Sequence, residues 1–376
     1  MNKQWEKWSK EDIRSFQDKF LNWYHDEKRN LPWRATNDPY AIWISEIMLQ
    51  QTRVDTVIGY YYRFMEQFPT IKDLAGAEEQ KLLKAWEGLG YYSRARNLKA
   101  AAQQIMAEFD GEMPQTITDI RSLKGIGPYT AGAIGSIAFG LPEPAIDGNV
   151  MRVVSRLFCI EADIAKASSR GVFDKAMRTI ISHDEPGEFN QALMDLGSSI
   201  CTPTSPLCEE CPLQEYCLAY QQGTQTDFPV KSKKAKPKDM YYIAGAIEED
   251  GRFLLVQRPE TGLLAKMWHF PLLEVDQATY MQLLAYWQDQ QLTLDAVAEE
   301  PAPIFPEFPV VWQKRHLGEV THIFSHLKWH ILLFYGRTPS EFSLEHSQWA
   351  APEEFEQYVF PKPQLKLVEQ LKKNHK

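Results

Sequence analysis

The stretch that decides the fold is Leu123-Lys-Gly-Ile-Gly-Pro-Tyr129-Thr-Ala, which is followed one predicted helix later by Asp147-Gly-Asn149. Gly125 and Gly127 allow a tight turn between two helices, and Pro128 suits the first position of the second helix. Such a turn points unpaired backbone N–H groups outward with a helix dipole behind them, which predicts an anion site. Asp147 would lie close to the anion, and this pairing indicates chemistry on a nucleic-acid backbone or sugar. The alternative is an ordinary Gly-Pro loop with a surface aspartate.

The chain has 376 residues, which is enough for two or three domains with cores of their own. Hydrophobic residues make up 44% and charged residues 24%, the composition of an ordinary globular protein. The first residues are polar, and no apolar run approaches the length that spans a bilayer. We therefore expect a cytoplasmic protein that makes no contact with a membrane.

The charge is unevenly distributed along the chain. The net charge is −9, yet residues 231–238 contain five lysines and no acidic residue. A DNA-binding protein usually shows a basic surplus. Any contact with DNA would therefore have to come from a local patch and from backbone amides.

Residues 1–220 have the pattern of helices joined by short turns, which predicts a compact all-α bundle. The segment 38–52 begins with the start signal Asp-Pro and continues amphipathically. The glycine-flanked aromatic turn Gly88-Leu-Gly-Tyr-Tyr92 stands apart from this scheme. Further helices are predicted at 54–68, 78–87, 96–109, 116–123, 128–139, 147–158, 170–182 and 188–200.

The pattern changes after the lysine-rich segment. Tyr241–Ile247 and Arg252–Gln257 are predicted strands, and Glu248-Glu-Asp-Gly251 between them is a hairpin signal. We therefore predict a multidomain chain, in which a helical domain at 1–224 and a basic linker at 225–240 precede an α+β domain at 241–376. Further strands are predicted at 270–275, 320–325 and 328–335, and helices near 276–291 and 352–358.

Four of the five cysteines lie close together in the loop 201–217, with the spacing Cys201-x6-Cys208-x2-Cys211-x5-Cys217. Four thiolates in one loop predict a soft metal centre, either zinc or an iron–sulfur cluster. A single CxxC pair and the absence of histidine from this loop favour [4Fe–4S] over zinc, and a disulfide is unfavoured in a reducing compartment. Cys159 lies in an apolar context, which predicts a buried core thiol.

Glu46 lies among apolar residues of the predicted helix 38–52. A carboxylate on such a segment usually forms a salt bridge at the rim. If it faces a pocket instead, desolvation raises its pKa, and the carboxyl group can stay protonated and act as a general acid.

These motifs occur in one order: Glu46-Ile-Met-Leu-Gln-Gln-Thr52, the hairpin 123–129, Asp147-Gly-Asn149 and the four cysteines. Together they resemble the helix-hairpin-helix DNA glycosylases with an iron–sulfur cluster, and most closely the adenine DNA glycosylase family of the MutY type. That family removes adenine mispaired with 8-oxoguanine in base excision repair and leaves an abasic site. The resemblance implies that Glu46 protonates adenine N7, and that Asp147 stabilises C1′ of the sugar or bonds covalently to it. Tyr129 and Asn149 would support them. The two acids must then titrate differently, with the pKa of Glu46 raised by burial and Asp147 kept ionised by hydrogen bonds.

One position separates this chain from endonuclease III-like relatives. Those enzymes carry a lysine two residues after the second hairpin glycine, where it forms a Schiff base with the sugar. Here Tyr129 occupies that position, and Lys124 precedes Gly125 within the turn. The resemblance therefore implies a monofunctional glycosylase with weak or no lyase activity; endonuclease III and thymine glycosylase activities are the alternatives.

The C-terminal segment resembles a Nudix fold at Gly251–Arg258 and Gly262–Pro271. A Nudix hydrolase would next show Arg-Glu-x-x-Glu-Glu to bind magnesium, and the segment Leu272–Tyr280 lacks it. Phe324-Ser325-His326 resembles the loop with which the family recognises 8-oxoguanine, although such a triplet could also be an ordinary strand end. Two rival functions remain open: Nudix hydrolysis, and a non-catalytic iron–sulfur protein that only binds damaged DNA.

The resemblance also implies contacts with a double-stranded DNA that contains an adenine:8-oxoguanine mispair, made by a monomer. Gln51 and Tyr91 are expected to wedge into the duplex near the lesion, although Tyr91 could simply pack against Tyr92. The expected pocket for adenine consists of Arg29, Trp33, Arg34 and Gln191. The expected DNA and lesion contacts are Gln51, Thr52, Leu89, Tyr91, Gly125, Gly127, Phe324, Ser325 and His326.

Overall fold

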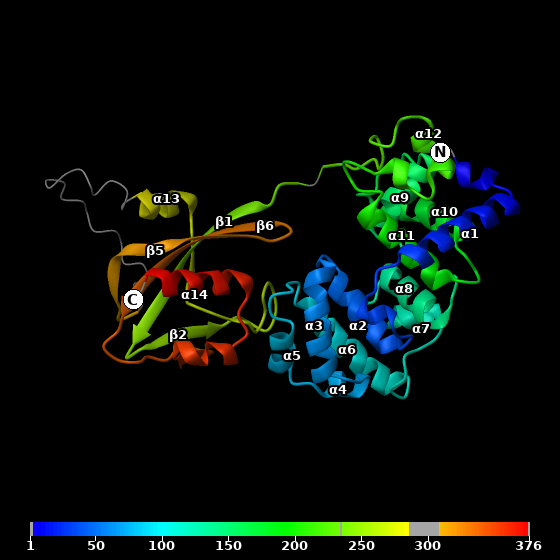
Figure 1. Cartoon of the computed structure of the whole chain (residues 1–376). Coiled ribbons are helices and arrows are strands. Elements are labelled where there is room, and N and C mark those ends of the chain that lie inside the picture. Colours follow the sequence, from blue (N-terminus) through cyan, green and yellow to red (C-terminus); the bar gives the residue numbers. More distant parts are fainter. Residues whose placement is uncertain (1–2, 234, 286–307, 375–376) are drawn as a thin grey trace. The chain divides into compact units, whose positions relative to one another are not determined.

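The structure is a computed structural model that describes residues 3–233, 235–285 and 308–374. The described residues fall into two compact units (Figure 1). The first lies within Met1–Glu78 and Ser93–Lys233, and the second lies within Glu79–Tyr92 and Lys234–Lys376. The short segment Glu79–Tyr92 thus belongs by its contacts to the C-terminal unit, although it is far from that unit in the sequence.

The first unit is helical, which confirms the predicted all-α class. None of the helices in the described part of the chain is long and apolar enough to cross a membrane. The α-helices of the first unit are α1 (Lys10–Glu27), α2 (Pro39–Leu49), α3 (Val54–Gln67), α4 (Ile71–Gly76), α6 (Ser93–Glu108), α7 (Ile117–Ser122), α8 (Pro128–Phe139), α9 (Gly148–Phe158), α10 (Arg170–Ile180), α11 (Pro186–Ser199) and α12 (Leu218–Gln221). Short 3₁₀ helices are η1 (Gln4–Lys7), η2 (Pro32–Arg34), η3 (Ala167–Ser169), η4 (Cys208–Glu210) and η5 (Gln214–Tyr216).

Helix α1, for which no individual helix was predicted, packs with α9, α10 and α11 rather than with α2, which follows it in the chain. Its start is set by Ser9, whose side chain accepts a hydrogen bond from Asp12 N, while Asp12 bonds back to Ser9 N. Phe16 and Phe20 of α1 are fully buried in the core of this helix group. Chain segments from both ends of the unit therefore meet in one core.

The hairpin between α7 and α8 uses its two glycines differently. Gly125 has φ +77, and a Cβ added there would lie 2.6 Å from Cβ of Asn97, so no other residue fits. Gly127 is the N-cap of α8 with φ −90 and ψ 177, an extended conformation that any residue can adopt. An added Cβ at Gly127 would meet nothing within 4 Å. Of the two glycines expected to allow the tight turn, only Gly125 therefore has a left-handed backbone.

The second unit contains a mixed sheet whose main path has the strand order β3-β2-β1-β6-β5, with β4 paired to β1 and β7 paired to β2. Strands β1 and β6 are parallel, with Lys238 opposite Leu327 and Glu248 opposite Arg337. The other pairs are antiparallel. The strands are β1 (Lys238–Glu249), β2 (Arg252–Gln257), β3 (Trp268–His269), β4 (Leu272–Val275), β5 (Val311–Ile323), β6 (Leu327–Arg337) and β7 (Ser347–Ala350).

Helices accompany this sheet, so the predicted α+β class of the C-terminal domain is confirmed. Leu367 and Leu371 on the last helix pack in one core with β-strand residues such as Phe253 and Leu333. Residues 286–291 of the helix predicted near 276–291 lie outside the described residues. The helical elements of this unit are α5 (Glu79–Ala85), α13 (Gln277–Ala285), η7 (Pro352–Gln357) and α14 (Lys362–Asn374).

Part of the predicted linker 225–240 is bonded to the first unit. Phe228 O accepts from Arg156 Nε at 3.0 Å, Val230 O accepts from Ile164 N at 3.0 Å, and Ser232 N donates to Asp163 at 3.2 Å. The last residues of the predicted linker, from Lys238 onward, already belong to β1. Only a few residues of the predicted linker therefore lie between these contacts and the first strand.

Candidate active site

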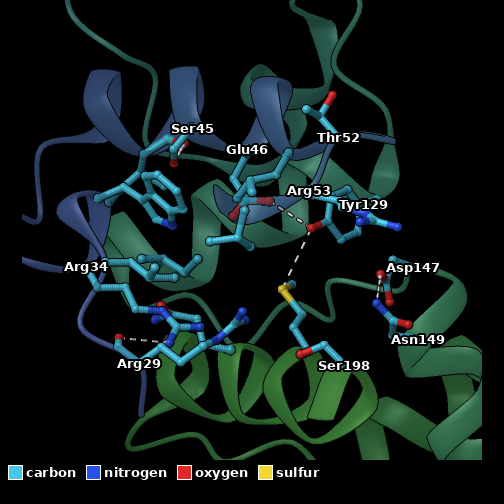
Figure 2. A pocket seen from close by; sticks show the side chains of 18 of the residues that line it. Arg29, Arg34, Ser45, Glu46, Thr52, Arg53, Tyr129, Asp147, Asn149 and Ser198 are labelled. Atoms are coloured by element: carbon cyan, nitrogen blue, oxygen red, sulfur yellow. Dashed lines mark hydrogen bonds between the residues drawn. The ribbon is translucent and has the colours of Figure 1, made fainter. Parts of the chain in front are cut away.

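The first unit contains a cavity of about 420 Å³, a volume typical of small-molecule sites. It lies where η2, α2 and the start of α8 face α9 and α11, so distant parts of the sequence share it (Figure 2). The residues predicted for catalysis and for the adenine pocket all line this cavity. They are Glu46, Tyr129, Asp147 and Asn149, together with Arg29, Trp33, Arg34 and Gln191; Thr52 lines it as well.

Glu46 reaches the cavity from a helix that is buried along most of its length. Asp38 caps the first turn of α2 by accepting a hydrogen bond from Tyr40 N at 3.1 Å, and Pro39 occupies the first helical position. Glu46 is 5% exposed, and its carboxylate accepts a hydrogen bond of 2.8 Å from the phenol of Tyr129 on α8 (Figure 2). The phenol, rather than a cation at the rim, is therefore the partner of Glu46.

Burial raises the pKa of Glu46 to about 7, because desolvation penalises the charged carboxylate. The hydrogen bond from Tyr129 opposes this change, the negative charge of Asp147 adds to it, and the positive charge of Arg34 opposes it. The same burial raises the pKa of the Tyr129 phenol well above its ordinary value. At neutral pH the cavity therefore offers a carboxyl group that can give or take a proton.

Asp147 is the N-cap of α9, which explains its fixed position. One carboxylate oxygen accepts a hydrogen bond from Val150 N at 2.7 Å, and the other accepts from Asn149 Nδ2 at 3.1 Å. We expected hydrogen bonds to keep this group ionised, but burial outweighs them and raises its pKa from the ordinary value. These bonds and the nearby charge of Arg152 still favour the carboxylate form. Burial thus acts on both acids of the cavity.

Asn149 is in turn held by Arg152, a buried residue that sequence analysis did not single out. The Arg152 guanidinium donates to Asn149 Oδ1 at 2.8 Å, to Gly197 O at 2.6 Å and to Cys201 O at 2.8 Å. A continuous series of hydrogen bonds therefore joins Asp147 to the backbone of the first cysteine in the loop 201–217. Arg152 lies one helical turn beyond Asn149, and this spacing is the only signal in the sequence.

Arg29 and Arg34 are held by Asp195 on α11, which was also not predicted. Asp195 is 5% exposed; it accepts from Arg29 Nε at 3.0 Å and also from Arg29 Nη2, and it accepts from Arg34 Nη1 at 2.7 Å. One buried carboxylate thus orients two arginines at the cavity wall. Nothing near Asp195 in the sequence marks it, because its partners lie more than 160 residues away.

The other two residues expected in the adenine pocket have ordinary surroundings. Trp33 is buried and packs edge-on against Tyr61, with ring centroids 5.5 Å apart. Gln191 donates to Gly187 O, four residues earlier on its own helix, at 3.3 Å. Both side chains line the cavity.

Gln51 and Tyr91, expected to wedge into DNA, both have left-handed backbones, with φ +59 and φ +49. Such a conformation is costly for a residue with a side chain and is concentrated at functional sites. Tyr91 is 48% exposed, whereas the side chain of Leu89 is buried and exposes only 7% of its surface. Leu89 thus contributes to the core of its segment and offers little side chain to DNA.

Phe324-Ser325-His326 forms the turn between β5 and β6, so the predicted strand 320–325 ends at Ile323. Phe324 N donates to Leu327 O at 2.7 Å, and the Phe324 ring packs edge-on against Trp329. Ser325 and His326 are exposed, and Ser325 Oγ lies 3.2 Å from the hydroxyl of Tyr91. Two segments that the resemblance assigns to lesion recognition are therefore in contact within the second unit.

The loop 201–217 surrounds a second, small cavity of about 30 Å³, which all four of its cysteines line. Arg156, buried on α9, donates to Cys201 Sγ at 3.3 Å and to the carbonyls of Thr202 and Pro203. Cys159 does not line this cavity. It is partly exposed at the C-cap of α9 rather than buried as predicted, with its thiol directed at Gln222.

Three segments of the chain match known families. Residues 44–177 match the HhH-GPD superfamily of base excision DNA repair proteins. Residues 201–217 match the iron–sulfur binding domain of endonuclease III, and residues 242–370 match the NUDIX domain. The iron–sulfur assignment of the cysteine loop is thereby confirmed, as is the Nudix-like nature of the C-terminal domain.

Individual proteins match over much longer stretches. The adenine DNA glycosylase of Rattus norvegicus is 37% identical over 401 aligned residues, which cover 92% of this chain and 75% of the rat protein. Among solved structures, endonuclease III trapped in a covalent DNA intermediate matches with a TM-score of 0.50 and 25% identity, covering 57% of this chain and 99% of that one. A thermostable thymine-DNA glycosylase matches with a TM-score of 0.50 and 27% identity, covering 56% of this chain and 97% of that one.

Proposed function

The chain belongs to the adenine DNA glycosylases of base excision repair, and we propose that it hydrolyses the N-glycosidic bond of adenine paired with 8-oxoguanine. The observation that carries this proposal is a pair of carboxyl groups on the wall of one cavity, that of Glu46 buried and that of Asp147 half-buried. Cleavage of a glycosidic bond needs a protonated leaving group and a stabilised oxocarbenium-like sugar. Two acids in different surroundings can supply both.

In the proposed mechanism adenine leaves the base stack and enters the cavity, because its reacting atoms cannot be reached in the duplex. Glu46, whose pKa of about 7 keeps much of it protonated, gives its proton to N7. The C1′–N9 bond breaks with its electron pair on adenine, and the Asp147 carboxylate stabilises the cationic sugar. The Glu46 carboxylate then takes a proton from the water that attacks C1′, which leaves an abasic site.

We propose that the chain is monofunctional, with weak or no lyase activity. A lyase of this superfamily needs an amine at the position of Tyr129 to form a Schiff base with the sugar. The phenol of Tyr129 is instead bonded to Glu46, where it lowers the pKa that burial raises. Tyr129 therefore supports the general acid Glu46 through this hydrogen bond, and the position carries no amine that could attack the sugar.

We propose that the exposed turn Phe324-Ser325-His326 contacts 8-oxoguanine, while Gln51, Thr52 and Tyr91 contact the DNA around the lesion. Gln51 and Tyr91 both have a left-handed backbone. This supports a wedge role, because strained backbone conformations concentrate at functional sites. Backbone N–H groups at Gly125 and Gly127 would bind phosphate at the N-terminus of α8. The burial of Leu89 restricts its contribution to the backbone or to packing beneath Tyr91.

We propose a [4Fe–4S] cluster for the cysteine loop, held by Cys201, Cys208, Cys211 and Cys217. At a Zn–S distance of about 2.3 Å, the sulfurs of a tetrahedral zinc site lie roughly 3.8 Å apart. All four cysteines line one small cavity, and their spacing in the sequence contains a single CxxC pair and no histidine, which favours the larger cluster. When bound, the cluster would cross-link the loop, and Arg156 and Arg152 connect that loop to α9.

The test is a single-turnover assay on matched duplexes that contain adenine opposite 8-oxoguanine, guanine or thymine. We expect release of adenine, fastest opposite 8-oxoguanine, and strand breaks only after alkaline treatment. Two further duplexes, one with a guanine:thymine mismatch and one with thymine glycol, serve as controls. Release of thymine or of thymine glycol from them would favour the thymine glycosylase or endonuclease III alternative. Size-exclusion chromatography of free and DNA-bound protein tests the proposed monomer.

A further inference from the structure

The segment Glu79–Tyr92, which contains α5 (Figure 1), is attached to the second unit at three separate places. Lys266, in the loop between β2 and β3, forms an ion pair of 3.1 Å with Glu79 and accepts a hydrogen bond from Gln80 through its carbonyl. The segment between η7 and α14 provides the second place, and Ser325 on the β5–β6 turn provides the third. A segment from the middle of the helical sequence is thus bonded along its whole length to the C-terminal unit.

Glu87 is the centre of the second attachment, and 17% of its side chain is exposed. One carboxylate oxygen accepts from Phe360 N at 2.8 Å, and the other accepts from Lys84 Nζ at 2.7 Å. Lys84 Nζ also donates to Tyr358 O at 3.0 Å. The two side chains therefore form a charged clamp on the backbone of residues 358–360, and charge-assisted bonds of this kind are about twice as strong as neutral ones.

The turn that follows Glu87 needs such support. Gly88, Gly90 and Tyr91 all have positive φ, at +96, +73 and +49, and the conformation of Tyr91 is strained. Trp86 Nε1 donates to Gly90 O at 3.2 Å and closes the turn from within. At its end, the exposed ring of Tyr91 places its hydroxyl 3.2 Å from Ser325 Oγ.

We propose that Glu87 and Lys84 are positioning residues that hold Tyr91 beside Ser325 and thereby set the preference for 8-oxoguanine over guanine opposite the excised adenine. This inference rests on the proposed function. Neither residue lines the cavity of the first unit, so neither touches the reacting atoms. Loss of either side chain removes bonds that hold the strained turn in place. Tyr91 and Ser325 are then no longer held side by side to contact the lesion base.

The test compares single-turnover adenine release from adenine:8-oxoguanine and adenine:guanine duplexes for the full chain and its variants. Glu87→Ala is expected to lower the rate on the 8-oxoguanine duplex about tenfold more than the rate on the guanine duplex. Lys84→Met, which removes the other half of the clamp, should reduce the preference in the same direction. Glu78→Ala, at an exposed neighbouring glutamate, is the matched control and should keep the wild-type ratio.

Thermal unfolding of each variant identifies a general loss of structure. An equal fall on both duplexes, or an unchanged ratio in both Glu87→Ala and Lys84→Met, would overturn the inference and leave the proposed function intact. A wild-type chain without any preference for the 8-oxoguanine duplex would overturn the proposed function and this inference together. The two failures are therefore distinguishable in one set of measurements.

Discussion

Glu46 in the cavity of the first unit is 5% exposed, whereas Ser325 and His326 on the β5–β6 turn of the second unit are exposed. The cavity uses burial to raise the pKa of its carboxyl groups, and each acid has a fixed hydrogen-bond partner. The turn exposes its hydroxyl and imidazole groups, and the Ser325 hydroxyl also lies 3.2 Å from the hydroxyl of Tyr91. Proton transfer benefits from desolvation, while recognition of a base benefits from accessible donors and acceptors. The contrast predicts that substitutions in the cavity lower the rate of adenine release on every duplex, whereas substitutions in the turn change the preference between duplexes.

The largest effect is expected for Glu46→Gln, which keeps the shape of the side chain and its hydrogen bond from Tyr129 but removes the acid. Loss of a general acid costs 10²–10⁴ in rate, and we expect about a thousandfold fall in adenine release. Affinity for the duplex should change little, because the hairpin and the β5–β6 turn are untouched. A variant that still releases adenine at a rate near wild type would show that Glu46 is not the acid.

Asp147→Asn separates the charge of Asp147 from its structural role, because asparagine also caps a helix well. We expect the rate to fall about a hundredfold, the typical loss of an electrostatic stabiliser, with the unfolding temperature preserved. Asp38→Asn, at the exposed N-cap of α2, is the matched control and should keep full activity. Equal losses in both variants would mean that capping alone explains the effect.

The pH dependence of adenine release tests the raised pKa of Glu46. The acid must be protonated, so the rate should fall about tenfold per pH unit as the pH rises above about 7. The remaining activity of Glu46→Gln should lose this dependence. A wild-type rate that stays constant from pH 6 to pH 9 would contradict the assignment, provided that duplex binding is saturated throughout.

The same carboxyl group should lower the stability of the protein at neutral pH. Its pKa is about 7 when folded and about 4.5 when unfolded, so the folded state holds the proton more tightly. Stability is therefore fully retained below pH 4.5 and falls as the pH rises from 4.5 to 7, by about 3 kcal/mol in total. Glu46→Gln should unfold at a higher urea concentration than wild type at pH 8. A gain that is equally large at pH 4.5 would have another cause.

The smallest effect is expected on the second unit. Ser325→Ala removes one exposed hydroxyl and should reduce the preference for the 8-oxoguanine duplex about fivefold, the value of one neutral hydrogen bond. The rate on the adenine:guanine duplex and the unfolding temperature should be unchanged. An equal fall in the rate of adenine release on both duplexes would show that the turn contributes to the reaction itself and not to recognition of the lesion alone.

The residues that bear chemistry could be named from the sequence, but the side chains that hold them could not. Glu46, Tyr129 and Asp147 lie in local motifs. The glycine, proline and capping residues of these motifs can be recognised from the neighbouring sequence alone. Asp195 and Arg152 are ordinary residues on ordinary helices. Their roles depend on partners that the fold brings together from far along the chain, which local propensity does not encode.

The second unit shows the same limit in its sheet. The hairpin of β1 and β2 could be predicted from Glu248-Glu-Asp-Gly251, because its register depends on a local turn. The parallel pairing of β1 with β6 joins segments nearly 90 residues apart, and no local signal specifies it. Nor does any signal indicate that Glu79–Tyr92 groups with this unit.

By itself the sequence determined the two fold classes, the cysteine loop and the family, because periodicity, turn residues and spaced ligands are properties of neighbouring residues. Only the tertiary structure decided that burial raises the pKa of both Glu46 and Asp147, that Gly125 rather than Gly127 has the left-handed backbone in the hairpin, and that Leu89 is buried. Desolvation and steric fit are set by all atoms around a group, most of which come from distant parts of the chain.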